Sequence, residues 1–292
     1  LGNTDLEVSL IGMGCNNFGG RIDLQATREV VHESLDQGIT LFDTADVYAG
    51  RGNSEEALGD ILGPRRKEVI LSSKFGMAMA DDGTRQGASR AYILSAVEDS
   101  LRRLKTDWLD IYFLHKPDPA TPIEETLGAL DDLVQSGKVR HIGCSNLAAW
   151  QVVEADFTAR TAHQTAFSVA QDEYSLLSRD IEAELVPALT KYNLGLLPYY
   201  PLANGLLTGK YRRDAPMPEG ARLTKAQNLA AATGSEPPPL RVPLRRKSRP
   251  VGGGRLCPYL PIKTCGRWRA GRTCRLFPAG QSLFHSRDQH TG

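Results

Sequence analysis

The chain has 292 residues, of which 41% are hydrophobic and 24% charged, and its formal net charge is +1. This length is above that of an ordinary domain but suits a single α/β barrel, and no apolar run approaches the roughly 18 residues of a transmembrane helix. The first residues do not read as an export signal and five unevenly placed cysteines do not form a disulfide framework, so we expect a reducing, cytoplasmic setting.

Up to about residue 230, short apolar runs alternate with amphipathic stretches of helical period. The predicted strands are, in chain order, 6–10, 11–14, 39–42, 69–73, 109–114, 139–144, a strand within 161–169, and 194–199. The predicted helices are 26–37, 53–62, 89–104, 122–136, 147–155 and 180–192. Capping boxes mark two of the helix starts, at Asn53–Glu56 and Thr121–Glu124.

Seven rounds of strand and helix with short connections predict a parallel sheet covered by helices. Such a sheet is either doubly wound or closed into a (β/α)8 TIM barrel. A doubly wound nucleotide-binding sheet carries G-x-G-x-x-G between its first strand and a helix. The segment GMGCNNFGG at 12–20 has glycines but no helix directly after them. We therefore predict an α/β fold of the (β/α)8 TIM barrel type.

Polar or ionisable residues follow six successive predicted strands. They are Asp43, Lys74, His115, the pair Ser145 and Asn146, Gln171, and the pair Tyr199 and Tyr200. In a TIM barrel the active site lies at the carboxyl ends of the strands. Each residue taken singly has an ordinary structural explanation, as a helix cap, a solvated charge or a loop residue. Their joint occurrence favours a catalytic interpretation, whereas we interpret Asp46 as structural.

The residue types indicate proton donation to a carbonyl group. An aspartate and a lysine on neighbouring strands can pair, and an ammonium beside Tyr48 would lower the pKa of that phenol, which is ordinarily about 10. Tyr48 could then act as a general acid toward a carbonyl oxygen, with His115 donating a hydrogen bond to the same oxygen. The set provides no metal site and no activated nucleophile, so the hydride must come from a cofactor.

At this point the chain resembles the aldo-keto reductases. The similarity rests on six segments in the family's order: FDTADVYAGRGNSEEALG (42–59), LSSKFG (71–76), SLRRLKTDWLDIYFLHKPD (100–118), GKVRHIGCSN (137–146), VAQDEYSLL (169–177) and LPYYPLANGLLTGKY (197–211). Their form is closest to the bacterial branch that is also similar to potassium-channel β subunits.

The resemblance implies a NADPH-dependent oxidoreductase that reduces an aldehyde or ketone to an alcohol. The implied catalytic tetrad is Asp43, Tyr48, Lys74 and His115, with Tyr48 as the proton donor. The implied cofactor contacts are Ser145, Asn146, Gln171, Tyr199, Tyr200, Leu202, Gly205 and Lys210. Among these, residues 145, 146 and 171 would bind the nicotinamide carboxamide, Tyr199 would stack on the ring, and GLLTGKY would cover the pyrophosphate.

Two other functions remain open. One is a cofactor-sensing binding protein like the channel β subunits, and the other is a truncated, inactive reductase. The expected partner is a small carbonyl compound, with no nucleic-acid or membrane partner, while the particular substrate and the oligomeric state are not readable from the sequence.

The composition changes near residue 231. Residues 231–292 carry ten Arg and two Lys against two acidic residues, with eight Pro and eight Gly, whereas the first 230 residues have a net charge of −9. We therefore divide the chain into a barrel domain, 1–230, and an atypical tail, 231–292.

Three interpretations of the tail compete. It is a basic arm, a zinc module or a shifted reading frame. The zinc module would use Cys257, Cys265, Cys274, His285 and His290, but no C-x2-C pair supports it. We favour the shifted frame, because the resemblance stops inside an expected helix. The eighth βα unit, which in this family grips the adenosine end of the cofactor, would then be missing, so we expect weak NADPH affinity and low solubility.

Overall fold

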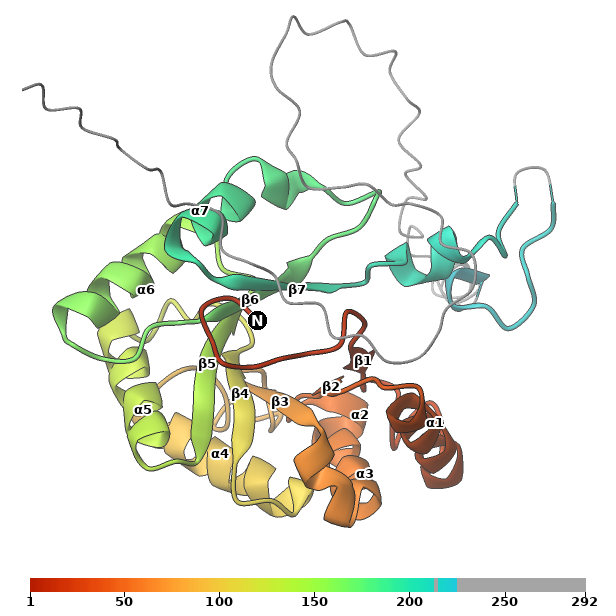
Figure 1. Ribbon diagram of the computed structural model, residues 1–292, viewed down its shortest axis with the longest axis horizontal. Coiled ribbons are helices and arrows are strands. Elements are labelled where there is room, and N and C mark those ends of the chain that lie inside the picture. The colour runs from red at the N-terminus through yellow and green to blue at the C-terminus, as the bar shows by residue number, and fades with distance from the viewer. Residues whose placement is uncertain (213–214, 225–292) are drawn as a thin grey trace, which may run out of the picture.

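The computed structural model describes residues 1–212 and 215–224. The predicted tail at 231–292, with its candidate zinc ligands, lies outside the described residues. Seven parallel strands form one sheet in chain order: β1 (Met13–Gly14), β2 (Leu41–Asp43), β3 (Ile70–Phe75), β4 (Leu109–Leu114), β5 (Val139–Ser145), β6 (Val169–Glu173) and β7 (Gly195–Tyr199). Figure 1 shows this sheet curved into a nearly closed barrel with the helices on its outside, which confirms the predicted barrel class.

The helices connect successive strands. They are α1 (Leu24–Asp36), α2 (Tyr48–Arg51), α3 (Asn53–Leu62), α4 (Arg90–Leu104), α5 (Ile123–Gln135), α6 (Ala149–Thr161) and α7 (Leu185–Tyr192), with short 3-10 helices η1 (Gly63–Glu68), η2 (Asp180–Glu182) and η3 (Ala203–Thr208). Within the two described ranges, no helix combines the length and the apolar character needed to cross a membrane.

The first predicted strand, 6–10, is not a strand. Its backbone is tied to residue 40 through side chains, since the Ser9 amide donates to Thr40 Oγ1 (2.9 Å) and the Thr40 amide donates to Ser9 Oγ (3.0 Å). Leu10 is 83% exposed, so the apolar run does not follow a strand alternation. Of the residues predicted as strands at 6–14, only Met13 and Gly14 pair with β2.

Three other boundaries differ from the prediction. Helix α6 continues to Thr161, and β6 begins only at Val169, the last residue of the predicted strand region. The predicted helix 180–192 is interrupted, and its regular part starts at Leu185. Neither predicted capping box forms. Asn53 is the first helical residue of α3, and Gly52 takes the cap position without a side-chain bond. At α5, the Thr121 hydroxyl donates to Asp118 and Pro122 takes the cap position.

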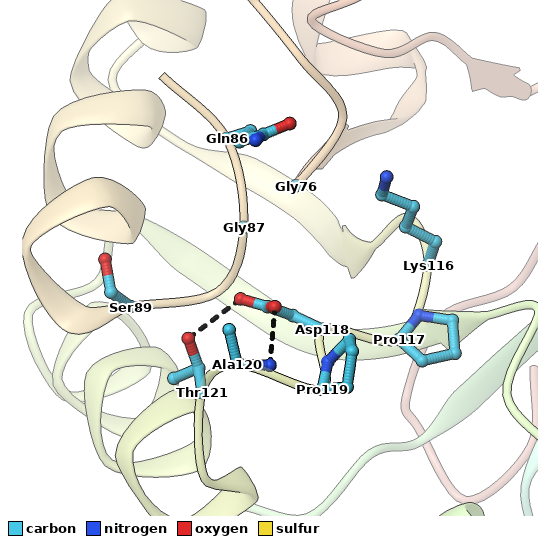
Figure 2. Close-up of a pocket in the computed structure, with 10 residues that line it drawn as sticks. All are labelled: Gly76, Gln86, Gly87, Ser89, Lys116, Pro117, Asp118, Pro119, Ala120 and Thr121. Carbon is cyan, nitrogen blue, oxygen red and sulfur yellow. Dashed lines mark hydrogen bonds between the residues drawn. The ribbon is translucent and has the colours of Figure 1, made fainter. Parts of the chain in front are cut away.

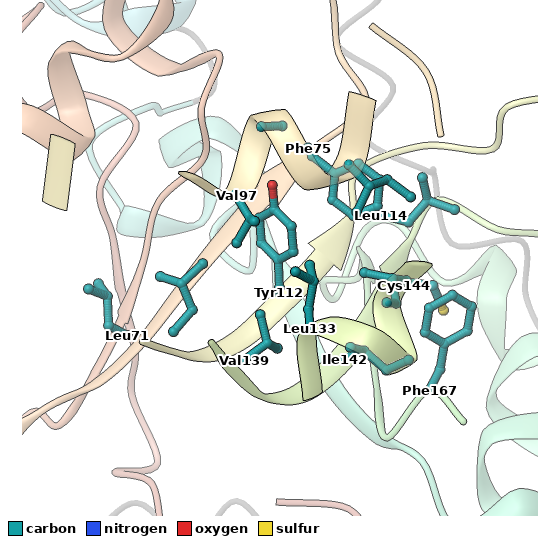
Figure 3. Packing of buried hydrophobic residues seen from close by; sticks show 14 of the residues in the cluster. Leu71, Phe75, Val97, Tyr112, Leu114, Leu133, Val139, Ile142, Cys144 and Phe167 are labelled. Carbon is teal, nitrogen blue, oxygen red and sulfur yellow. The ribbon is translucent and has the colours of Figure 1, made fainter. Parts of the chain in front are cut away.

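The core has two parts, one outside the sheet and one inside the barrel. Between sheet and helices, Tyr112 and Leu114 of β4 pack in a large cluster with residues of the surrounding helices (Figure 3). The alternate β4 residues Ile111 and Phe113 point inward, where they pack with Leu6 and with Val169 of β6. The N-terminal segment that was predicted as a strand therefore contributes Leu6 to the barrel interior.

Gly143 in β5 makes room for the inward-pointing ring of Phe113, its register partner. A Cβ at position 143 would lie 2.4 Å from Phe113 Cε1 and 2.8 Å from the Val169 carbonyl oxygen. We expect Gly143→Ala to lower the free energy of unfolding by about 1–3 kcal/mol through overpacking, as measured by urea denaturation. Gly14→Ala is the matched control, because a Cβ at this β1 glycine would meet nothing within 4 Å. Equal stability of the two variants would contradict the prediction.

Candidate active site

Lys74 stands at the centre of a polar group at the carboxyl ends of β2 and β3. Its side chain is fully buried, and its ammonium donates to Asp43 Oδ2 (2.7 Å), to the Thr44 carbonyl (2.7 Å) and to Tyr48 Oη (3.3 Å). These three contacts use the three N–H donors of an ammonium. Burial alone would lower the pKa of Lys74, but Asp43 and Tyr48 outweigh it and raise that pKa. The buried lysine therefore stays charged.

Asp43 is held in place by three donors. Besides Lys74, the Ser72 hydroxyl donates to Oδ1 (2.6 Å) and the Gln171 side-chain amide donates to the same oxygen (3.1 Å). Residue 43 ends β2, residue 72 lies on the neighbouring β3, and residue 171 reaches in from β6. The aspartate thus links strands on both sides of the barrel interior.

Tyr48 follows β2 at the start of the short helix α2, and it is half-buried. The sequence predicts that Lys74 lowers the pKa of Tyr48. In the structure burial is the larger effect and raises this pKa, although the Lys74 charge acts in the opposite direction. The predicted effect of Lys74 on the pKa of Tyr48 is therefore correct, but the predicted net lowering of that pKa is wrong. Tyr48 is protonated at neutral pH, which is the state a proton donor requires.

His115 follows β4 and presents its ring edge-on to Tyr48, with ring centroids 5.9 Å apart and planes at 81°. Its amide donates to the Phe75 carbonyl (2.9 Å), which fixes the end of β4 beside β3. Burial and the Lys74 charge lower the pKa of His115 to about 4, so the ring is neutral near pH 7. Nδ1 is buried and has no hydrogen-bond partner within the described part of the chain.

The residues expected to bind nicotinamide form a connected group on β5, β6 and β7. Ser145 Oγ donates to the Gln171 carbonyl (2.7 Å), and the Asn146 side-chain amide donates to Ser145 Oγ (2.9 Å) and to the His115 carbonyl (3.0 Å). Tyr199 Oη donates to Asn146 Oδ1 (2.7 Å). The structure brings these four predicted residues together, and joins them to the tetrad through Gln171 and His115.

The remaining predicted contacts lie in the segment after β7. Tyr200 is exposed and meets Tyr199 edge-on at 5.2 Å, and Leu202 is exposed as well. Gly205 lies in η3, and a Cβ there would come within 3.1 Å of the Lys210 ammonium. Leu202, Gly205 and Lys210 thus belong to a turn that stands apart from the buried tetrad.

This turn is held by its own backbone. Ala203, Asn204 and Gly205 all have positive φ angles, and the amides of Ala203 and Gly205 donate to the carbonyls of Tyr200 (2.7 Å) and Leu202 (2.9 Å). Lys210 adds an ammonium over Gly205, and the Arg222 guanidinium donates to Asn204 Oδ1 (2.9 Å). Arg222 was not predicted from the sequence. A cation shortly after the GLLTGKY segment is the only signal that could have indicated it.

Asp46 is buried behind the tetrad, at 1% exposure, which agrees with its structural interpretation. Among the residues that the structure describes, neither carboxyl oxygen has a hydrogen bond of ordinary geometry, although the Val47 amide lies close enough to favour the ionised form weakly. Burial and the neighbouring carboxylate of Glu55 raise the pKa of Asp46 to about 8. Asp46 therefore carries a proton at neutral pH.

The raised pKa of Asp46 predicts a pH-dependent stability. The folded state holds the proton more tightly than the unfolded state, where the pKa is near its ordinary 3.8. Ionisation of Asp46 therefore does not lower the free energy of unfolding below pH 4, and it lowers it progressively between pH 4 and pH 8. Its contribution falls by at most about 1.4 kcal/mol per pH unit in that window. We expect Asp46→Asn to remove this slope, as seen in urea unfolding of both proteins at pH 5 and pH 8. Parallel pH profiles for variant and wild type would contradict it.

The chain has clear relatives. Residues 10–248 match the model of the aldo/keto reductase family. The chain is 38% identical over 239 residues to the uncharacterized oxidoreductase YrpG of Bacillus subtilis, covering 78% of this chain and 72% of that protein. It is 38% identical over 220 residues to the aldo-keto reductase YhdN of the same organism, covering 73% and 64%. It is 36% identical over 238 residues to a probable voltage-gated potassium channel subunit beta of Oryza sativa, covering 79% and 71%.

Proposed function

The chain belongs to the aldo/keto reductase family and is an oxidoreductase, and we propose that it reduces the carbonyl group of an aldehyde or ketone to an alcohol with NADPH. The observation that carries the proposal is the buried Lys74 ammonium, which bonds Asp43 and Tyr48 Oη together. A tyrosine hydroxyl beside a fully buried cation is suited to donating a proton.

The proposed roles follow from the contacts of the tetrad. Tyr48 binds the carbonyl oxygen and passes its proton to that oxygen as the alcohol forms. The phenolate left behind is stabilised by Lys74, whose charge is more favourable to the phenolate than to the neutral phenol, so this contact favours the transition state over the bound substrate. Asp43 fixes the lysine, and the neutral His115 ring orients the carbonyl with its single N–H.

The cofactor would be held by the residues of β5–β7 and the turn that follows. Ser145, Asn146 and Gln171 offer a hydroxyl and two amides for a carboxamide, and Tyr199 offers a ring. Beside the η3 turn, Lys210 and Arg222 offer positive charge for the phosphates. Bound there, NADPH supplies the hydride that the protein's own side chains cannot.

A cofactor-sensing protein without turnover is the weaker candidate. The channel-subunit relative supports it, but relatives named as an oxidoreductase and an aldo-keto reductase match this chain at slightly higher identity, 38% against 36%. Turnover separates the two candidates, because a sensor would bind NADPH without steady consumption.

The test is NADPH consumption by the purified full chain against a panel of aldehydes and ketones that includes both neutral and carboxylate-bearing compounds. We expect alcohol formation that depends on both cofactor and carbonyl compound. A stable fold that binds NADPH but consumes it with no member of the panel would contradict the proposal. Fluorescence titration gives the cofactor affinity, which we expect to be weak. A dissociation constant in the low micromolar range or tighter would refute that expectation.

A further inference from the structure

We propose that the pocket between the loops following β3 and β4 holds the carboxylate of the substrate, with Lys116 as its counter-ion. The substrate class is then a carbonyl compound that also carries a carboxylate group. This inference rests on the proposed reductase function and specifies its substrate. The pocket, here called the rim pocket, has a volume of about 330 Å³ and is bounded by Gly76, Gln86, Lys116 and Asp118 among others (Figure 2).

Two residues that line the rim pocket are close in sequence to residues of the tetrad. Gly76 stands two residues after Lys74, and Lys116 follows His115 directly. The Gly87 amide donates to the Gly76 carbonyl (3.2 Å) and closes the loop after β3, and the Ala88 amide of this loop donates to Asp118 Oδ2 (2.7 Å) of the loop after β4. The groups proposed for nicotinamide come from β5–β7, whereas this pocket lies between β3 and β4 in the strand order. The proposed substrate would have its carbonyl at His115 and its carboxylate in this pocket.

Lys116 places a cation on this rim, where its charge contributes to lowering the pKa of the Asp118 carboxyl. Its side chain is exposed and forms no ion pair with another described residue, whereas two neighbouring rim arginines are engaged, Arg51 with Asp81 and Arg85 with Asp99. The Lys116 ammonium is close enough to His115 to help lower the pKa of that ring. Figure 2 shows its side chain extending away from Asp118.

The acidic residue of the pocket, Asp118, is ionised, and donors of both loops engage its carboxylate. Asp118 Oδ2 accepts from the Ala88 amide (2.7 Å) and the Thr121 hydroxyl (2.8 Å), and Oδ1 accepts from the Ala120 amide (3.0 Å). Three donors thus surround this carboxylate, and it serves to tie the two loops together. Lys116 and the Gln86 amide remain as groups that can meet a carboxylate.

The competing explanation is a solvated lysine with no ligand, and a matched pair of aldehydes separates the two. The probes are 4-formylbenzoate and its neutral methyl ester, compared by kcat/KM with NADPH and the full chain. We expect wild type to prefer the acid. Lys116→Met should lower the acid-to-ester preference about threefold to fivefold, chiefly through KM, as befits a partly exposed ion pair. Lys116→Arg should keep the preference, and added salt should weaken it in wild type.

The control is Lys67→Met, which removes an exposed lysine from η1, ahead of β3 and so at the opposite end of the barrel. It should leave both kcat/KM values unchanged. Turnover of both aldehydes without preference, or a preference that survives Lys116→Met, would overturn this inference and leave the reductase proposal standing. Turnover of neither aldehyde, nor of any neutral carbonyl compound, would overturn both.

Discussion

Tyr48→Phe is expected to lower kcat for carbonyl reduction by about 100-fold to 10,000-fold, the range for loss of a general acid. The variant removes only the hydroxyl. The ring remains to meet His115 edge-on and to lie 4.9 Å from the Lys74 ammonium, so local packing is kept. Lys74 retains its two shorter contacts, with Asp43 and the Thr44 carbonyl. The loss should therefore fall on proton transfer rather than on folding.

Two measurements and one control variant accompany this variant. The thermal midpoint and the NADPH dissociation constant should stay close to those of wild type, which would assign the loss to the chemical step. Tyr192→Phe is the matched control, because this tyrosine lies on the outer helix α7, against Phe157 and Arg160, and should leave kcat unchanged. Full activity of Tyr48→Phe would refute the assignment of the proton donor.

The grouping of the candidate site residues could be predicted because each lies at or just beyond the carboxyl end of a strand. In a parallel barrel all strand ends meet on one face, so Asp43, Lys74 and His115 come together without any local contact that the sequence needs to specify. The protonation of Tyr48 could not be predicted in the same way. Burial raises the pKa of Tyr48 and the Lys74 charge lowers it, so the net shift depends on how deeply the ring is buried. That burial depends on the whole surrounding structure.

Other features depended on partners distant in the chain. The pattern at 6–10 is compatible with a strand, but Ser9 finds its partners in Thr40, and Leu6 fills the space between β4 and β6. Asp118 was read only as part of a motif, yet it joins two loops through contacts with Ala88 and Thr121. Periodicity reports which side of an element is buried and not which distant side chain meets it.

The buried pair of Glu55 and Arg103 is the clearest case, because nothing in the sequence marks it. Glu55 is fully buried in α3. Its Oε2 accepts from Arg103 Nε of α4 at 2.6 Å, and its Oε1 accepts from the Ser73 hydroxyl at 2.5 Å. Asp46 lies near enough to feel the Glu55 charge. Removing the arginine would therefore leave a buried carboxylate beside a second carboxyl group, with one hydroxyl as its remaining donor.

Arg103→Met is expected to lower the free energy of unfolding by about 3–5 kcal/mol, the typical cost of breaking a buried ion pair on one side. Methionine keeps much of the aliphatic chain that packs close to Gly52, so the loss reports the missing charge rather than a cavity. Equilibrium urea unfolding measures it.

The double variant Glu55→Leu/Arg103→Met provides the decisive comparison. Two apolar side chains in place of a buried pair are often no less stable than the pair itself, because neither charge is then left without a partner. We expect the double variant to regain most of the stability that Arg103→Met loses, which gives a coupling energy of opposite sign to the single losses. Additive losses would mean that α3 and α4 are held by the packing of these side chains rather than by their charges. In that case the ion pair would not account for the stability of the helices next to the tetrad.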